Sequence, residues 1–241
     1  MDIGPIEHML PVLVLSTLDW LCVIAIMIGL FRIDYEDNRG QALFVAVQMA
    51  AFSYVVQASE AGGYLIGLEM LLFVVSVWLF FQIHWMYAVA TGLICYHGWR
   101  SLLSALVWGI SLAGVPKGNI FAPLAPGAIA AHGLAYLVVA GAVYWIYRKR
   151  FWFTFVRETR SQWPKLSDKS NLAMLLTAGA DVLLFNRIGL LPDALGRPVW
   201  LLLSCVFGLL VIALLTYYCF VMEQKSIRVS FAAIRKETAD S

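Results

Sequence analysis

Six ionisable side chains stand within stretches of the chain that are otherwise almost entirely apolar. These residues are Asp19, Glu69, His97, Arg100, His132 and Asp181. An ionisable group buried at membrane depth without a partner is costly, so such groups pair with one another or line a functional site. Arg100 is the most constraining of the six, because a guanidinium keeps its proton in proteins. We therefore expect a polar cluster inside a bundle of apolar helices.

The spacing around Arg100 indicates how this cluster is arranged. His97 lies three residues before Arg100 and Ser104 lies four residues after it, which places the three side chains on one face of a helix. We expect Arg100 to face the bundle interior and to pair with Asp19 or Asp181. Three interpretations stay open: the pair fixes the register of the helices, the cluster lines an outward-opening cavity that receives a ligand, or the groups relay protons.

Catalytic and metal-binding patterns are absent from the sequence. It contains no His-Glu-x-x-His, no Gly-x-Ser-x-Gly, and neither the Walker nor the Rossmann glycine pattern. The four cysteines all fall in apolar stretches without Cys-x-x-Cys spacing, which argues against a zinc site and a disulfide framework. Cys95 and His97 point to different sides of a helix, which disfavours an intramembrane cysteine protease. We expect a non-enzymatic protein without a cofactor or a metal.

Composition and apolar stretches define the elements that must position these residues. Hydrophobic residues make up 61% of the 241 residues, charged residues make up 13%, and the mean hydropathy is +0.80. The apolar stretches cover residues 9–31, 42–58, 64–81, 85–113, 127–147, 172–185 and 199–222. Because a membrane-spanning helix needs about 20 residues, the sequence predicts an all-α polytopic membrane protein with about seven transmembrane helices. The sixth stretch is short, so it can be re-entrant or can continue to residue 191.

The basic residues indicate how the protein is oriented. The gaps 32–41, 82–84, 148–171 and 223–241 hold 13 of the 17 Lys and Arg residues, whereas the alternate gaps hold only 3. Cytoplasmic loops are enriched in Lys and Arg. The sequence therefore predicts a multi-pass protein of the cell membrane, with its N-terminus outside and its C-terminus inside.

The chain divides into a transmembrane bundle, residues 1–222, and a cytoplasmic tail, residues 223–241. In the tail, Ile227, Phe231 and Ile234 recur at helical spacing among basic residues, which predicts an amphipathic helix. Such a helix lies on the inner leaflet or pairs with a partner helix, and we favour the leaflet. On the outer side, loop 115–127 carries three prolines and two glycines and is expected to form a turn or hinge.

Three short motifs resemble the membrane sensor portion of receptor histidine kinases of the accessory-gene-regulator type, which detect signal peptides in Gram-positive bacteria. The motifs are Leu30-Phe31-Arg32-Ile33, Leu79-Phe80-Phe81-Gln82-Ile83-His84-Trp85-Met86-Tyr87-Ala88 and Gly92-Leu93-Ile94-Cys95-Tyr96. The likeness covers about residues 10–110 and implies a bundle of six or seven helices with its C-terminus inside. In those kinases a phospho-accepting histidine and an ATP-binding domain follow the last span. Here no histidine follows His132, so we expect a sensor-like bundle without the kinase.

We therefore expect a non-enzymatic membrane sensor or modulator that takes part in signal transduction. It would bind a hydrophobic or peptide ligand from outside, or a membrane-protein partner that can be a second copy, and it would not bind nucleic acid. Loop 115–127, His97 and Arg100 would meet the ligand, and Asp19 would neutralise Arg100. The alternative is a small permease or the membrane subunit of a transporter, with Glu69, His132 and Asp181 along the translocation path.

Overall fold

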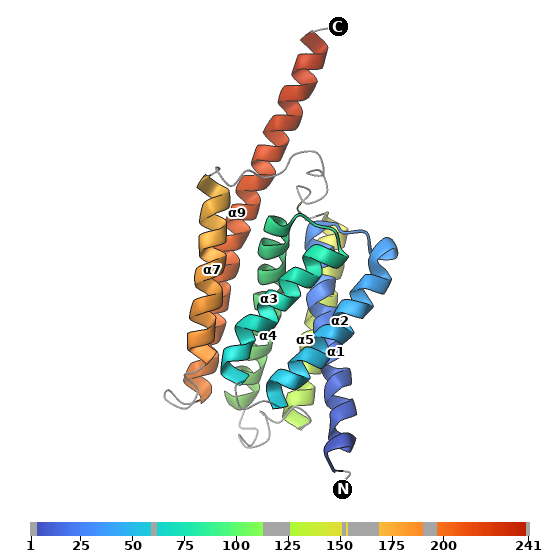
Figure 1. The fold of residues 1–241 in the computed structure, drawn as a ribbon, viewed down its shortest axis with the longest axis vertical. Helices are drawn as coiled ribbons and strands as arrows, with labels where there is room; N and C mark the ends of the chain where they lie inside the picture. The colour runs from blue at the N-terminus through green and yellow to red at the C-terminus, as the bar shows by residue number, and fades with distance from the viewer. Residues whose placement is uncertain are drawn as a thin grey trace.

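The computed structural model describes residues 4–58, 62–112, 126–150, 153, 169–189 and 197–239, which form seven helices and no strand. The helices are α1 (Gly4–Phe31), α2 (Tyr35–Ala58), α3 (Gly62–Phe80), α4 (Trp85–Leu112), α5 (Pro126–Lys149), α7 (Lys169–Gly189) and α9 (Arg197–Ala239) (Figure 1). The predicted all-α class is confirmed, and each predicted apolar stretch falls largely on one helix.

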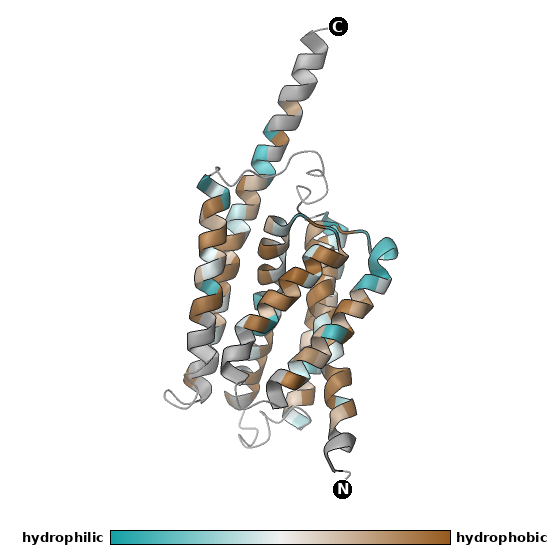
Figure 2. Ribbon diagram, viewed as in Figure 1, coloured by the Kyte–Doolittle hydropathy of each residue, from teal (hydrophilic) through white to brown (hydrophobic). Residues whose placement is uncertain are grey.

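Three segments of the described helices are long and apolar enough to cross a membrane. They are Met9–Phe31 in α1, Pro126–Lys149 in α5 and Leu202–Lys225 in α9, and Gly67–Phe80 in α3 forms a shorter apolar helix. Brown, hydrophobic residues dominate these helices in Figure 2. The sixth apolar stretch belongs to α7, which continues past Phe185 and has 21 residues. At a rise of about 1.5 Å per residue, α7 is long enough to match a hydrocarbon core of about 30 Å.

Two compact turns set α1 against α2 and α3 against α4. Arg32 and Gln82 adopt left-handed backbone conformations, with φ of 50° and 53°, where the preceding helices end. Asp34 then caps α2, because its Oδ1 accepts a hydrogen bond of 3.1 Å from the backbone N–H of Glu36. His84 caps α4 in the same way through Nδ1. Partial burial lowers the pKa of His84 below its ordinary value, which keeps the imidazole neutral at pH 7 and able to accept.

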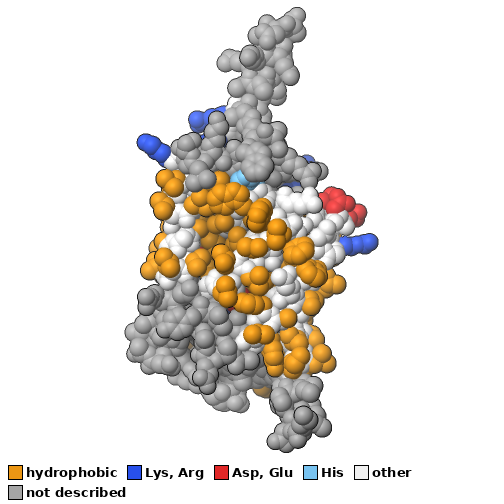
Figure 3. All heavy atoms as spheres, in the orientation of Figure 1, with side chains coloured by type: hydrophobic (Ala, Val, Ile, Leu, Met, Phe, Trp, Pro, Cys, Tyr) orange, Lys and Arg blue, Asp and Glu red, His pale blue; other side chains and the backbone are white. Residues whose placement is uncertain are grey.

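Helix α4 is the centre of the bundle. It contacts α1, α3, α5, α7 and α9, and most of its residues between Met86 and Trp99 are buried. In Figure 1, α7 and α9 lie on one side of α3 and α4, and α1, α2 and α5 lie on the other. The outward face of the bundle is also apolar: Leu137 on α5 and Leu183 on α7 are 72% and 70% exposed. Figure 3 shows hydrophobic side chains over this surface and charged ones toward the end from which α9 projects.

Helix α9 continues well beyond the bundle. It has 43 residues, so its length is about 64 Å at a rise of about 1.5 Å per residue, roughly twice the thickness of a hydrocarbon core. Its last turns point away from the other helices (Figure 1), and Phe231 within them is 68% exposed. The tail is thus helical, as expected, but it extends α9 without a break. The bend that the favoured position on the leaflet would require is not present.

A polar layer centred on helix α4

The six ionisable residues that the sequence singled out belong to three clusters, and the first joins α1 to α5. Asp19 on α1 lies 2.8 Å from His132 Nδ1 and accepts a hydrogen bond of 2.8 Å from the Tyr136 hydroxyl, both through Oδ1. The ring of Trp99 on α4 stacks against Tyr136, with centroids 5.7 Å apart. The carboxylate and the imidazole are half-buried, with 21% and 14% of their side chains exposed. This cluster therefore lies toward the edge of the bundle.

The second cluster joins α1, α2, α3 and α4 around the buried carboxylate of Glu69. The Ser53 hydroxyl donates to Glu69 Oε1, and the Tyr96 hydroxyl donates to Oε2 at 3.4 Å. Trp20 in turn donates its indole N–H to Ser53 Oγ at 3.0 Å. A carboxylate with neutral donors from two other helices fixes the relative positions of all three, because a buried acceptor left without donors is costly.

The third cluster joins α4 to α7 beneath α9 and is the most deeply buried. His97 Nε2 and Asp181 Oδ2 lie 2.8 Å apart, and each side chain is only 1% exposed. Gly208 of α9 lies against His97 and Ser101, and a Cβ at that position would clash with Ser101 Oγ. Among the described residues, Asp181 Oδ1, Ser101 Oγ and Ser204 Oγ are buried without a hydrogen-bond partner. The bundle thus encloses a compact polar site where three helices meet.

Arg100 does not form the ion pair that the sequence predicts. Its guanidinium carbon lies 5.9 Å from the centroid of the Tyr96 ring, in a cation–π arrangement. Within the described part of the chain, no carboxylate lies within 4.0 Å of Arg100. Glu69 and Asp19 are close enough to interact with it electrostatically. The predicted pairing with Asp19 or Asp181 is wrong, because histidines on α5 and α4 take those two carboxylates.

One turn of α4 brings the three clusters together. The residues that do so are Tyr96, His97, Trp99 and Arg100. The rings of Tyr96 and His97 are in edge contact, with centroids 5.7 Å apart, so the second and third clusters touch. We refer to these residues and their partners as the polar layer. Because six of the seven helices donate or accept in it and the seventh, α9, packs on it, a change in one part of the layer affects the positions of its neighbours.

Sequence reasoning missed the neutral members of the polar layer. Ser53, Tyr96 and Tyr136 supply hydroxyl donors, and Trp20 supplies an indole N–H. A signal was available for Tyr136, which follows His132 by four residues and therefore shares its helix face. Aromatic residues in apolar helices more often fill the core or the membrane interface, so their type alone does not reveal such a role.

Several predicted features stay untested by this geometry. The loop predicted to meet the ligand, residues 115–127, falls mostly outside the described part of the chain. The structure describes only its last two residues, which begin α5. Within the described ranges, no group of three or more His, Cys, Asp or Glu side chains is arranged to hold a metal ion.

Comparison of the chain with protein-family models, curated proteins and solved structures finds no match.

Proposed function

We propose that all seven helices cross the cell membrane, with the N-terminus outside and the C-terminus inside. The asymmetry of the Lys and Arg residues supports this orientation. The polar layer supports the proposal that all seven helices cross, because helices that share buried hydrogen bonds stay together in one bundle. In this orientation the projecting end of α9 lies in the cytoplasm.

We further propose that the protein is a non-enzymatic membrane sensor or modulator, as its resemblance to peptide-sensing receptors implies. It binds a hydrophobic or peptide ligand, or a membrane-protein partner, and reports this binding through α9. The observation that carries the proposal is the contact of Gly208 with His97 and Ser101. Through this contact the helix that leaves the membrane packs directly on the polar layer.

The proposed mechanism is a shift between two arrangements of the layer. A ligand can change the position of α9 only by as much as its affinity differs between the two arrangements. Rearranging one buried pair, such as His97 and Asp181, involves free energies of a few kcal/mol. That is enough to exchange a minor arrangement for a major one. Because α9 has no break, a displacement at Gly208 is carried to its cytoplasmic end.

The proposal predicts that altering the layer moves the end of α9. Spin labels would be placed at Phe231→Cys and at Arg39→Cys, both exposed positions, in a chain whose Cys22 and Cys205 are replaced by alanine. Electron paramagnetic resonance in lipid nanodiscs then measures the distance between the labels. We expect His97→Gln to shift or broaden the distance distribution, because it changes the shape and the hydrogen bonding of the side chain beneath α9.

The matched control for this measurement is Leu137→Ala on the outward face of α5, where the side chain is 72% exposed. It should leave the distances unchanged. An unchanged distribution in folded His97→Gln protein would contradict communication through α9. The same two cysteines test the orientation, since both should be protected from an impermeant thiol reagent until the cells are permeabilised.

The second candidate function is transport, and the two His–carboxylate contacts are the observation that favours it. Histidine and carboxylate chains form proton relays in pumps and transporters. The structure distributes Glu69, His132 and Asp181 among the three clusters, each with its own partners. An assay with proteoliposomes that contain only this protein and a pH-sensitive dye distinguishes transport from sensing. Proton flux above that of empty liposomes would favour transport over sensing.

A further inference from the structure

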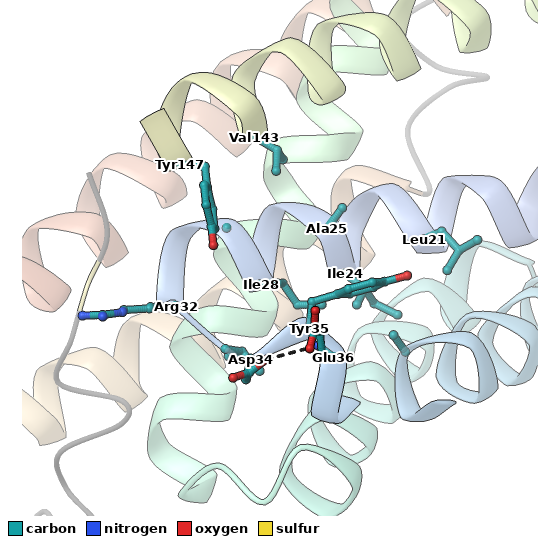
Figure 4. Close-up of a pocket in the computed structure, with 13 residues that line it drawn as sticks. Leu21, Ile24, Ala25, Ile28, Arg32, Asp34, Tyr35, Glu36, Val143 and Tyr147 are labelled. Carbon is teal, nitrogen blue, oxygen red and sulfur yellow. Dashed lines mark hydrogen bonds between the residues drawn. The ribbon is translucent and has the colours of Figure 1, made fainter. Parts of the chain in front are cut away.

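A pocket lies between α1, α2 and α5 at the end of the bundle from which α9 projects. Its volume is about 690 Å³, within the range of small-molecule sites. Ile24 and Ile28 line it from α1, Val143 and Tyr147 line it from α5, and Glu36 lines it from the start of α2 (Figure 4). It is separate from the polar layer, since none of the lining residues belongs to that layer.

Small residues on α1 and α2 create the pocket. Ala25, Gly29 and Ala42 line its wall, so three helices meet there with little side-chain volume between them. At Gly29 an added Cβ would lie 3.4 Å from a methyl group of Val143, in van der Waals contact. The two helices are therefore about as close as an alanine at this position would allow, and the pocket lies beside this approach.

The pocket is apolar at one end and charged at the other. The end nearer the middle of α1 is lined by Leu21, Ile24 and Ile28, whereas the other end is lined by Asp34 and Glu36 (Figure 4). Arg32 and Tyr147 also line the charged end, and Arg32 extends beyond it, whereas the ring of Tyr35 lies over Ile24 in Figure 4. Figure 2 shows the same change from hydrophobic to hydrophilic residues where α1 passes into α2. The gradient runs along α1 and so, in the proposed orientation, along the membrane normal.

This gradient matches the chemistry of a single membrane lipid. In a bilayer the acyl chains fill the hydrocarbon core and the headgroup lies at the interface, where long basic side chains also place their charge. A free polar metabolite would leave the apolar end unfilled, and a plain hydrocarbon would make no use of the charged end, where Asp34 and Glu36 are exposed. An amphiphile satisfies both ends at once.

We propose that this pocket binds one phospholipid with a primary ammonium headgroup, such as phosphatidylethanolamine. An acyl chain lies along Ile24 and Ile28, and the ammonium donates to the carboxylates of Asp34 and Glu36. The positive charge of Arg32 complements the phosphate. The leaflet is the cytoplasmic one, which rests on the proposed orientation, whereas the binding itself does not depend on signalling through α9.

Lipid retention by the full-length protein tests this site. The protein is reconstituted in nanodiscs of equal parts phosphatidylethanolamine, phosphatidylcholine and phosphatidylglycerol, extracted in mild detergent and analysed by native mass spectrometry. We expect one retained lipid, predominantly phosphatidylethanolamine. Ala25→Phe fills the pocket and should weaken its retention about tenfold, equivalent to about 1.4 kcal/mol. Ala140→Phe makes the same change on the exposed face of α5 and should have no effect.

A second variant keeps the test decisive if Ala25→Phe fails to fold. Glu36 is exposed and lies at the start of α2, so Glu36→Gln should fold normally. It removes one carboxylate charge and should abolish the preference for phosphatidylethanolamine while a lipid is still retained. Equal retention of the three lipids by the parent protein, or by Ala25→Phe and Ala140→Phe, would overturn the proposal. Because the readout is lipid mass, its failure would not bear on the position of α9.

Discussion

Replacing Asp181 with leucine is expected to destabilise the bundle by about 1–3 kcal/mol, the cost typical of leaving a buried hydrogen-bonding group without its partner. His97 would remain 1% exposed and would lose the carboxylate that lies 2.8 Å from its Nε2. Leucine does not supply the missing acceptor, and water has little access. The change should lower the apparent melting temperature of the protein in nanodiscs, measured by intrinsic tryptophan fluorescence.

The related variants separate loss of the pair from a change in packing. Asp181→Asn has nearly the same shape and can still hydrogen-bond to His97, so it should lose much less stability. The double variant His97→Leu with Asp181→Leu removes both members of the pair and should recover part of the loss. Leu183→Ala on the exposed face of the same helix should have little effect. A double variant as unstable as the two single losses combined would show that the pair contributes no coupling.

The helices of this protein could be predicted from sequence because the membrane simplifies the problem. Backbone groups in hydrocarbon must bond within their own segment, so long apolar stretches become helices whatever their neighbours are. Even the short sixth stretch proved to belong to the longer α7, which includes Asn186 and Arg187. The sequence left open whether this stretch is re-entrant or continues to residue 191, and α7 does continue, as far as Gly189.

The partners within the polar layer could not be predicted, because the sequence does not say which helices are adjacent. Asp19 and Arg100 were expected to pair on charge alone, yet α5 lies beside α1 and brings His132 to that carboxylate instead. Asp181 likewise meets His97, which the sequence had placed beside Arg100 as a second ligand-binding group. Opposite charge identifies candidates for burial, whereas helix packing decides which donor is within reach.

The direction of α9 was the other feature beyond the reach of sequence. The spacing of Ile227 and Phe231 predicts an amphipathic helix but says nothing about a bend where the membrane ends. A helix that lies on the leaflet and one that continues outward can have the same pattern. The contact at Gly208, which fixes the path of α9 across α4, depends on two residues that are far apart in the chain.

Gly208→Ala is expected to destabilise the contact between α4 and α9 by about 1–3 kcal/mol, the range for overpacking a well-packed interior. The added methyl would overlap Ser101 Oγ, and to relieve the overlap either the buried Ser101 side chain must change its rotamer or the helices must separate. Ser101→Ala removes that oxygen, and the Ser101 Cβ lies 3.6 Å from the added carbon, an ordinary contact. The pair Gly208→Ala with Ser101→Ala should therefore restore the melting temperature that the single change lowers.

Gly98→Ala on α4 provides the matched control, since a Cβ there meets nothing within 4 Å. It reports the intrinsic effect of alanine in a helix, which stabilises by up to about 1 kcal/mol relative to glycine. If Gly208→Ala behaved like Gly98→Ala, α9 would not pack closely on α4. Restoration by Ser101→Ala, together with recovery of the distance between the labels at Arg39→Cys and Phe231→Cys, would mean that one atom beneath Gly208 sets the position of α9. The polar layer and the projecting end of α9 would then be linked through a single steric contact.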